Sequence, residues 1–346
     1  MLRSIMYQMS FKIMNVSIVN PKNNSPLTFT GTGFVDSFGN IFPIVKGVAR
    51  ICESENYTVN FGVQWNKFDK TQLDNEIDGL NLSRRRFFAE THWDQEDLTG
   101  QCILEVGSGA GRFSKVVLEH TKAVLYSVDY SDAVSANFKN NSQIAPDRFH
   151  LFQASVYEMP FPDDSFDKVF CLGVLQHTPD FDASIKALIG KAKPGGEIAV
   201  DFYPIKGWWT KINSKYILRP ITKRMQHDHL LKLIDKNIDW LIKVHYIFHR
   251  IGLGFMTRFL PLCNVNESFP KSLTNAEVRE WAILDTFDMY SPEHDHPQRI
   301  ADVAKMFERQ GAQVTFSGIE QFGEGMSASV VRGIKLKIEN TDNVGC

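Results

Sequence analysis

A glycine-rich turn connects a short apolar run to an amphipathic stretch in the sequence ILEVGSGAGRF. The apolar residues CILEV have the length of a buried strand, and RFSKVVLEHT has the pattern of a helix. Gly107, Gly109 and Gly111 leave room for a ligand to approach the backbone, because glycine carries no Cβ. The following helix offers unpaired N–H groups and the positive end of its dipole. The turn therefore predicts a site for a polar or anionic ligand at the carboxyl end of the strand.

Strands and helices alternate after this turn. AVLYSVD, RFHLFQAS, DKVFCLGVL and EIAVDFY read as strands, and ASIKALIGKA reads as a helix. This alternation predicts βαβ units in a doubly wound, mainly parallel α/β sheet. Residues 205–260 interrupt it with two or three amphipathic helices. A helix at NAEVREWAI, a polar loop at DTFDMYSPEHDHPQ, a helix at RIADVAKMFERQGA and two strand-like runs then complete the sheet.

The spacing of the glycines differs from that of a dinucleotide-binding fingerprint. That fingerprint has the order G-x-G-x-x-G, and its third glycine position is Arg112 here. Asp129 ends the second strand about 20 residues further on, where an acidic side chain can accept hydrogen bonds from two ribose hydroxyls. We therefore expect a nucleoside-bearing ligand. Arg112 argues against a nicotinamide-dependent oxidoreductase, which is one alternative.

Residues 101–203 resemble class I S-adenosylmethionine-dependent methyltransferases, and especially the methyltransferase type 11-like branch that acts on quinones and other small molecules. The matching stretches, in the family's order, are ILEVGSGAGRFS, LYSVDYS, FQASVYEMPFPDDSFDKVFCLGVLQHTPD and KAKPGGEIAVDFY. The resemblance implies a seven-stranded Rossmann-like sheet with S-adenosyl-L-methionine as its cofactor. It also implies an enzyme that moves a methyl group to an acceptor by in-line displacement.

The resemblance assigns the cofactor-binding residues to the ends of the first four strands. Glu105 would orient the amino end of the methionine, and Asp129 would bind the ribose hydroxyls. The family often has Gly-Asp at the adenine, where this chain has Ala154 and Ser155, so the contact there would fall to the backbone of Ser155 and Val156. The other expected cofactor contacts are Gly107, Ser108, Gly109, Gly111, Tyr130 and Leu172.

Two groups of residues are candidates for the chemistry. Methyl transfer mainly requires alignment of the reactants, and a base is needed only where the acceptor must lose a proton. His177, after the fourth strand, has an ordinary pKa that suits a base, and the alternative is that it caps or braces its turn. DTFDMYSPEHDHPQ resembles an acceptor-side loop of related enzymes, with Tyr290 and His296 as candidate catalytic residues. Alternatively it is a solvated helix-capping loop, or a metal site, although no recognisable ligand spacing supports a metal and none is expected.

The N-terminal segment resembles a zinc-ribbon-like domain that precedes some methyltransferases. Asn20 and Asn23 occupy the positions of its C-P-x-C pair, and asparagine is a poor zinc ligand compared with thiolate. We therefore expect a degenerate ribbon that packs without metal. The first 20 residues lack the apolar core and the cleavage site of a signal peptide. Five scattered cysteines without a C-x-x-C pair favour a reducing cytoplasm.

The charge of the chain is unevenly distributed. The whole sequence has 38 Lys and Arg against 40 Asp and Glu, a net charge of −2. Residues 205–260 hold 11 basic and three acidic residues, a local charge of +8, so the remainder carries −10. This basic, aromatic-rich segment is either a helical lid with an ordinary solvated face, or a lid that admits an anionic or lipid-linked acceptor and contacts a membrane surface. Nucleic acid is not expected, because no recognised binding module is present.

These observations combine into one prediction. The chain is expected to be a cytoplasmic S-adenosylmethionine-dependent methyltransferase whose acceptor is a small molecule or is glycan- or lipid-linked and is methylated on oxygen. A non-catalytic cofactor-binding or scaffold protein is the alternative. The expected parts are a ribbon-like segment at 1–60, a helical linker at 61–100, the core at 101–204, an insertion with the acceptor-side loop at 205–296, the end of the core at 297–337, and a tail at 338–346.

Overall fold

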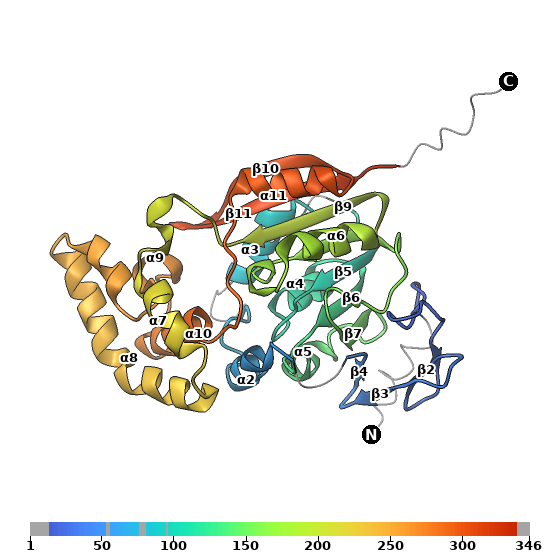
Figure 1. The fold of residues 1–346 in the computed structure, drawn as a ribbon, viewed down its shortest axis with the longest axis horizontal. Coiled ribbons are helices and arrows are strands. Elements are labelled where there is room, and N and C mark those ends of the chain that lie inside the picture. The colour runs from blue at the N-terminus through green and yellow to red at the C-terminus, as the bar shows by residue number, and fades with distance from the viewer. Residues whose placement is uncertain (1–13, 53–55, 76–80, 95, 338–346) are drawn as a thin grey trace.

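A computed structural model describes residues 14–52, 56–75, 81–94 and 96–337 (Figure 1). The expected tail, residues 338–346, lies outside these residues. Residues 1–13 also lie outside them, and they make up most of the N-terminal stretch that was expected not to be a signal peptide.

Eleven strands form one sheet, in the order β1-β2-β3-β4-β7-β6-β5-β8-β9-β11-β10. The strands are β1 (Thr28–Phe29), β2 (Gly33–Val35), β3 (Ile41–Val45), β4 (Val48–Arg50), β5 (Cys102–Val106), β6 (Val124–Asp129), β7 (Phe149–Gln153), β8 (Phe166–Cys171), β9 (Ala192–Phe202), β10 (Ala312–Gly323) and β11 (Met326–Lys335). Strands β7, β6, β5, β8 and β9 pair in parallel, and β11 runs antiparallel to both of its neighbours. The predicted α/β class is confirmed.

The number of strands corrects the expectation of seven. The seven expected strands run from β7 to β10 in the sheet, and β1–β4 extend it at the β7 edge. Ala49 of β4 pairs in parallel with Phe152 of β7. This pairing covers the backbone groups that an edge strand would otherwise expose. The N-terminal segment is therefore joined to the sheet by hydrogen bonds.

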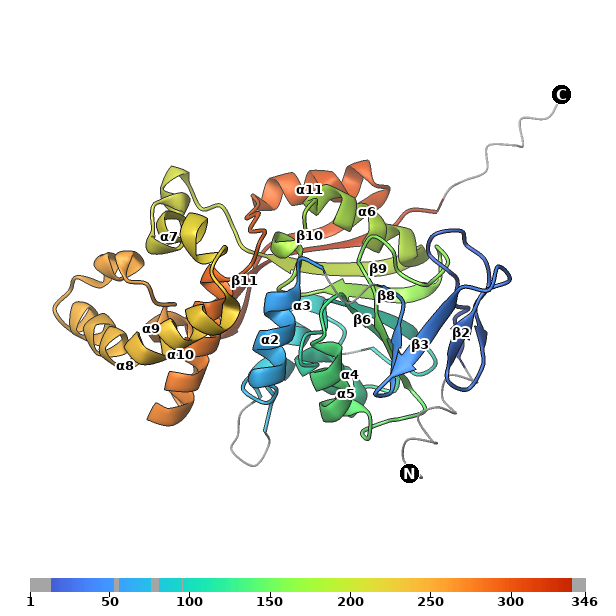
Figure 2. The same ribbon diagram turned by 60° about the horizontal axis from the view of Figure 1, so that its bottom comes forward.

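Helices cover both faces of the sheet. They are α2 (Val59–Lys67), α3 (Leu82–Thr91), α4 (Arg112–His120), α5 (Val134–Asn141), α6 (Phe181–Lys191), α7 (Ser214–Thr222), α8 (His227–Arg250), α9 (Val265–Ser268), α10 (Asn275–Tyr290) and α11 (Ile300–Arg309), with 3₁₀ turns η1 (Leu175–His177), η2 (Trp208–Lys211) and η3 (Gly254–Phe259). Helices α3, α4 and α5 lie together on one face, and α6 and α11 lie on the other (Figures 1 and 2).

The central strands are buried on both faces, as parallel strands between helices require. Every residue of β5 and β7 is buried. Aromatic side chains fix α3 on the sheet, because the rings of Phe87 and Phe170 have centroids 5.2 Å apart and Trp93 packs on both. The carboxyl ends of the strands are thereby held in fixed positions.

A buried carboxylate organises the N-terminal segment. Asp36 Oδ2 accepts hydrogen bonds from Asn20 Nδ2 and Asn40 Nδ2, each at 2.7 Å, and from Asn23 Nδ2 at 3.3 Å. Burial alone would raise the pKa of Asp36, but these hydrogen bonds outweigh it and hold the pKa below its ordinary value. Asn20 and Asn23 thus bind a carboxylate. A group of three or more His, Cys, Asp or Glu side chains that could hold a metal does not occur among the described residues.

The insertion has a hydrophobic core of its own, at the end of the sheet marked by α7, α8 and α10 (Figure 2). Leu231, Ile234 and Ile238 of α8 pack against α10, and Phe68 and Leu82 of the linker join the same cluster. The described helices include none that is both long enough and apolar enough to span a membrane.

The polar stretch after NAEVREWAI is helical up to Tyr290, where a loop was expected. The helix begins with a capping box in which Thr274 and Glu277 exchange hydrogen bonds, and burial of Trp281, Leu284 and Phe287 holds its other turns. Only residues 291–299 form a loop.

Candidate functional site

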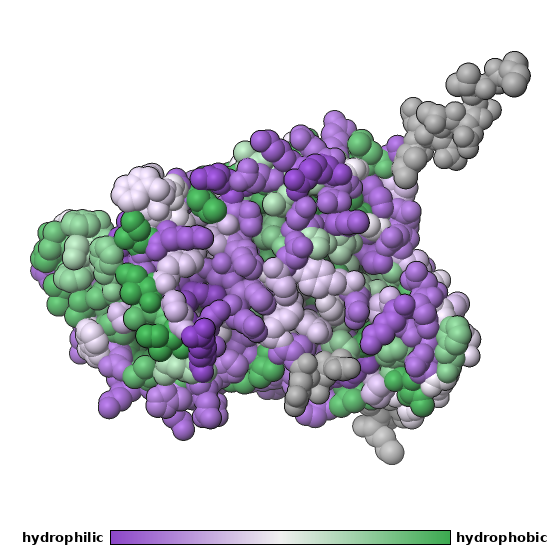
Figure 3. All heavy atoms as spheres, in the orientation of Figure 1, coloured by the Kyte–Doolittle hydropathy of each residue, from purple (hydrophilic) through white to green (hydrophobic). Residues whose placement is uncertain are grey.

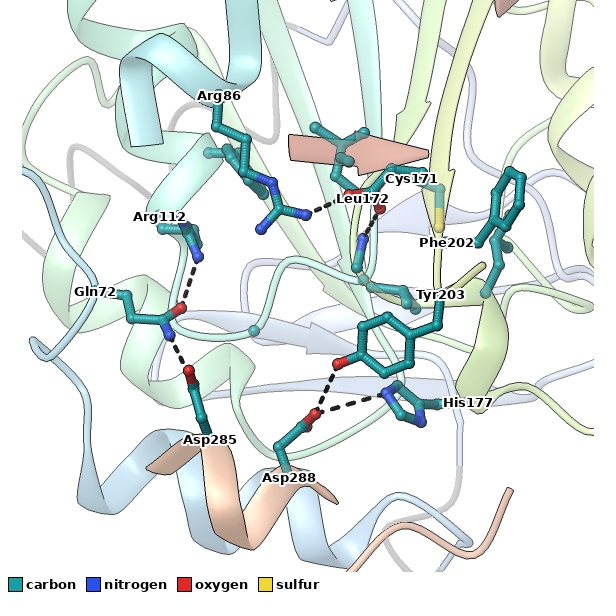
Figure 4. A pocket seen from close by; sticks show the side chains of 18 of the residues that line it. Gln72, Arg86, Arg112, Cys171, Leu172, His177, Phe202, Tyr203, Asp285 and Asp288 are labelled. Atoms are coloured by element: carbon teal, nitrogen blue, oxygen red, sulfur yellow. Dashed lines mark hydrogen bonds and ion pairs between the residues drawn. The ribbon is translucent and has the colours of Figure 1, made fainter. Parts of the chain in front are cut away.

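A cavity of about 1060 Å³ lies at the carboxyl ends of β5, β6, β8 and β9. Helix α2 and the linker close one side of it, and α10 closes another. This position, outside the ends of parallel strands, is where open α/β sheets bind ligands. Figure 4 shows the part of the cavity between the sheet and α10.

The glycine turn forms the floor of the cavity. Gly107, Gly109 and Gly111 all have positive φ angles, of 82°, 53° and 86°, which side-chain-bearing residues rarely adopt. A Cβ at Gly107 would collide with Val174, and a Cβ at Gly111 with side chains of α5. Gly107 and Ser108 line the cavity, and Ser108 Oγ is buried without a hydrogen-bond partner among the described residues. The predicted strand–turn–helix unit thus presents backbone and one free hydroxyl to a ligand.

Asp129 stands at the cavity wall beside this turn. Its Oδ2 accepts a hydrogen bond from Gly109 N at 2.7 Å, and its Oδ1 accepts bonds from Ser131 N at 2.8 Å and Ser131 Oγ at 2.6 Å. Burial raises the pKa of Asp129, and these hydrogen bonds oppose the rise. The carboxylate is held in place, and its remaining lone pairs are available to a pair of ligand hydroxyls.

Glu105 lies behind the turn and is not one of the residues that line the cavity. Its Oε2 accepts hydrogen bonds from Ser114 Oγ and from Ser127 Oγ, the latter at 2.8 Å. Its Oε1 is buried without a partner among the described residues. Burial, the largest cause, raises the pKa of Glu105 to about 7. These bonds join the end of β5 to α4 and β6, so the geometry supports a bracing role more directly than contact with methionine.

The raised pKa makes a prediction about stability. In the folded state Glu105 keeps its proton up to about pH 7, whereas an ordinary glutamate loses it near pH 4.5. The contribution of Glu105 to the stability of the folded state is therefore fully present below pH 4.5, and it is lost as the pH rises through 7. Glu105→Gln cannot titrate. We expect the melting temperature of the variant, relative to that of the ligand-free wild type, to rise by a few degrees between pH 5 and pH 8. Glu119→Gln on the exposed side of α4 is the matched control, and an equal shift in both variants would contradict the assignment.

The other expected cofactor contacts fall into two groups. Tyr130, Val156 and Leu172 line the cavity, as do Gly107, Ser108 and Gly109. Gly111 and Ser155 do not line it, and the Oγ of Ser155 accepts a hydrogen bond from Tyr157 N at 3.2 Å within its own turn. Any contact at this end of the cavity is therefore left to Val156 and its neighbours.

Helix α2 supplies cavity residues that were not among the predicted cofactor contacts. Gln64 is 1% exposed, lines the cavity, and has no hydrogen-bond partner for either side-chain polar atom among the described residues. Trp65 covers the turn, since a Cβ at Gly109 would lie 3.2 Å from its Nε1. A buried amide without partners costs free energy unless a ligand satisfies it. The aromatic, helical character of FGVQWNKFD was the available signal.

One face of α10 forms the opposite wall. Trp281, Leu284, Asp285, Asp288 and Met289 all line the cavity. They recur at helical positions i, i+3, i+4, i+7 and i+8, so one side of the helix faces inward. Two carboxylates are thereby brought opposite the ends of the sheet strands (Figure 4).

Asp285 is the end of a polar chain across the cavity. Arg112 Nη1 donates to Gln72 Oε1 at 2.6 Å, and Gln72 Nε2 donates to Asp285 Oδ1 at 3.1 Å (Figure 4). Burial raises the pKa of Asp285 to about 7. Burial lowers the pKa of Arg112 to about 10, so its guanidinium is charged at neutral pH. None of the ion pairs between described residues involves Arg112, which leaves a cation available to an anionic group.

Asp288 joins His177 and Tyr203. Its Oδ2 accepts a hydrogen bond from the Tyr203 hydroxyl at 3.0 Å and lies 3.8 Å from His177 Nε2 (Figure 4). His177 Nδ1 is 3.2 Å from the carbonyl oxygen of His294, and this contact favours a proton on Nδ1. Nε2 is then an acceptor, and it has no hydrogen-bond partner among the described residues. Burial lowers the pKa of His177, so the ring is neutral at neutral pH.

Tyr290 and His296, the two expected catalytic residues of the acceptor-side loop, lie outside the cavity. Tyr290 is 2% exposed in the core of the insertion, and its hydroxyl donates to Ser214 Oγ at 2.8 Å. His296 is exposed, and its backbone N donates to Gln176 O at 2.7 Å. Neither lines the cavity. Helix α10 continues through residues 285–290, where a loop was expected. The register of this helix points Asp285 and Asp288 toward the cavity and Tyr290 away from it.

Part of the chain is similar in sequence to known proteins. Residues 104–200 match the family described as a methyltransferase domain. The tRNA U34 carboxymethyltransferase of Nautilia profundicola is 26% identical over 151 residues, which are 43% of this chain and 49% of that protein. The ubiquinone/menaquinone biosynthesis C-methyltransferase UbiE of Vibrio parahaemolyticus is 30% identical over 128 residues, 36% of this chain and 46% of that protein. The chain spans about half the length of the curated relatives it matches.

Solved structures are similar at low identity. The magnesium protoporphyrin IX methyltransferase of Synechocystis PCC 6803 with bound SAH has a TM-score of 0.44 at 15% identity, covering 81% of this chain and 96% of that chain. A protein from Methanococcus maripaludis that is assigned as an S-adenosyl-L-methionine-dependent methyltransferase has a TM-score of 0.44 at 14% identity, covering 84% of this chain and all of that chain.

The glycine turn, Asp129 and the matched domain define the core as a class I methyltransferase domain with S-adenosyl-L-methionine as its cofactor. The residues present fit this cofactor. Carboxylate oxygens suit the ribose, the glycine floor leaves space for the chain of the methionine, and the unpartnered polar atoms of Gln64 and Ser108 await hydrogen bonds.

Proposed function

We propose that the chain transfers a methyl group from S-adenosyl-L-methionine to a hydroxyl of a small apolar or lipid-linked acceptor. The observation that carries this proposal is the neutral, unpartnered His177 Nε2 in the same cavity as the glycine turn. Val174, three residues before His177, packs on Gly107, so the two features are close neighbours.

The cofactor supplies an activated methyl group on a sulfonium, so the protein mainly has to bind and align. Asp129 would accept the ribose hydroxyls, and the backbone of Gly107 and Gly109 would lie under the methionine. Gln64 and Ser108 offer buried polar atoms at the same end of the cavity. Helix α2 would exclude water from this end, because Trp65 covers the turn.

His177 would act as the base for the acceptor hydroxyl. With Nδ1–H donated to His294 O, Nε2 can accept the proton that the hydroxyl loses. The resulting imidazolium would be stabilised by the Asp288 carboxylate 3.8 Å away, and Tyr203 holds that carboxylate by its own hydrogen bond. An acceptor that must lose a proton is therefore favoured, and this supports methylation on oxygen.

The walls of the cavity support an acceptor with apolar surface. Phe202, Trp281, Leu284, Phe322 and Met326 surround the polar groups on the acceptor side. A glycan without a lipid would place its polar groups against these apolar walls. An aromatic ring or an acyl chain would instead bury the walls against apolar surface. The charged Arg112 additionally favours a negative group, on the acceptor or at the methionine carboxylate.

A labelling experiment tests the proposal. The purified chain is incubated with S-adenosyl-L-methionine carrying a ¹³C-methyl group, and with either an organic-solvent extract or an aqueous extract of cells. We expect label in the organic-phase product, with the chemical shift of a methoxy group. Label attached to carbon would overturn oxygen as the acceptor atom, and label confined to bulk tRNA, tested in parallel, would overturn the acceptor class.

A further inference from the structure

Exposed apolar side chains are concentrated on the outer surface of the insertion. Of the 21 large apolar side chains that are exposed among the described residues, 13 lie between Trp208 and Phe259. Trp208 is 81% exposed and Phe255 is 66% exposed. Apolar residues gather over these helices at the left end of the molecule in Figure 3. A patch of this kind usually marks an interaction surface.

Helix α8 carries a continuous part of this patch. Leu233, Trp240 and Ile247 of α8, and Ile251 directly after it, are between 46% and 58% exposed. The first three are seven residues apart, so they stay within roughly 40° of one another around the helix and form a stripe along it. The buried Leu231 and Ile238 lie about 160° and 140° around the helix from Leu233, on the side where α10 packs. The stripe therefore faces away from the protein core.

Lysines run beside this stripe. Lys236 and Lys243 follow Leu233 and Trp240 by three residues each, which places them about 60° to one side of the stripe. Both are exposed, and no ion pair between described residues involves either one. The nearby acids of the helix are already paired, since Asp235 and Asp239 each lie 3.0 Å from Arg279 of α10. The outer surface of α8 thus combines an apolar stripe with unpaired positive charge.

We infer that the outer surface of α8, together with η2 and η3, binds the surface of an anionic lipid bilayer. Exposed tryptophans and isoleucines would enter the boundary between headgroups and acyl chains, and the lysines would contact lipid phosphates. None of the described helices can span a membrane, so the helix would lie in the plane of the interface. Charge complementarity selects this partner over a second copy of the chain, because two copies would bring together two segments that each carry a local charge of +8.

This surface goes beyond the methyl-transfer site, because α8 contributes no residue to the cavity. Helix α10 lies between them, with one face on the cavity and the other in the core that it shares with α8. Membrane binding would therefore bring the acceptor-side wall close to a lipid surface without changing the site itself.

Vesicle sedimentation tests the inference with the full chain. The probes are vesicles of pure phosphatidylcholine and vesicles with about one third phosphatidylserine. We expect binding to the anionic vesicles at least about tenfold tighter than to the neutral ones, and weaker binding as salt is raised. Trp240→Ser with Ile247→Ser, and Lys236→Gln with Lys243→Gln, should each weaken binding by about tenfold.

Matched variants separate this result from general effects. Phe38→Ser, at a 74% exposed side chain on the N-terminal segment, is the control for the apolar variant. Lys186→Gln with Lys305→Gln, on α6 and α11, is the control for charge, and both controls should bind like wild type. Circular dichroism checks that each variant is folded, and cofactor affinity should be unchanged throughout. Three results would each overturn the inference. The first is equal vesicle binding by all variants, and the second is a dimer of the chain that Trp240→Ser with Ile247→Ser dissociates. The third is a wild-type chain that binds tRNA but no vesicles, and whose tRNA binding these variants abolish.

Discussion

Replacing Asp129 by alanine is expected to weaken the binding of S-adenosyl-L-methionine by about 100-fold or more. The Asp129 carboxylate is fixed beside the glycine turn by hydrogen bonds from Gly109 N and from the backbone N and Oγ of Ser131. A hydrogen bond to a charged group contributes about 1.5–3 kcal/mol, and the ribose would offer two. The loss of both corresponds to two or more factors of ten in the dissociation constant. Isothermal titration calorimetry measures it directly.

Two companion variants sharpen this test. Asp129→Asn keeps the shape and one acceptor oxygen but loses the charge, so we expect an intermediate loss of about tenfold. Asp132→Ala removes a neighbouring carboxylate whose side chain is 62% exposed and pairs with Arg50 at the surface. It should change affinity less than about twofold. An Asp132 variant as weak as the Asp129 variant would show that local structure, and not the ribose contact, is being measured.

Replacing His177 by alanine is expected to slow methyl transfer to a hydroxyl by about 10²-fold to 10⁴-fold, the usual contribution of a general base. The cofactor affinity should stay within about twofold, because His177 is not among the residues that would hold the cofactor. The measurement is single-turnover transfer of a labelled methyl group to the acceptor found in the organic extract. His296→Ala is the control, because that exposed side chain lies outside the cavity, and it should have no effect. Equal activity of both variants would leave His177 as a brace for its turn.

The pH profile distinguishes a base from a structural histidine. Burial lowers the pKa of His177, and the Asp288 carboxylate opposes that shift. The wild-type rate should therefore fall with decreasing pH only below the ordinary histidine value of 6.5, where Nε2 becomes protonated. Asp288→Asn removes the opposing carboxylate, so it should move this decline to still lower pH while reducing the maximal rate. A decline that stays in place in the Asp288 variant would contradict the pairing.

The cofactor half of the site could be predicted from the sequence because its parts are local. Gly107, Gly109, Gly111 and Asp129 belong to one strand–turn–helix–strand unit, and their spacing alone fixes where they meet. Glu105, Gly111 and Ser155 are the exceptions, because none of them lines the cavity. The hydroxyl of Ser155 accepts a hydrogen bond from Tyr157 N in the same turn. The sequence could not reveal which neighbour would take that hydrogen bond.

The acceptor half depended on boundaries that local signals obscured. Asp, Thr and Ser favour turns, and DTFDMYSP therefore read as a loop. In the folded chain, burial of Trp281 and Phe287 outweighs those preferences, and the helix continues to Tyr290. The register of that helix then turns Asp285 and Asp288 toward the cavity and Tyr290 away from it.

The sequence by itself determined the doubly wound sheet, the glycine turn with its carboxylate, and the basic insertion. Each of these features follows from patterns of residues that are close to one another along the chain. The tertiary structure alone decided what lies opposite the turn. Gln72 meets Asp285 across 213 positions, and His177 meets the carbonyl of His294 across 117. Such contacts follow from how separate helices pack their apolar faces, and no local pattern encodes the partner that packing selects.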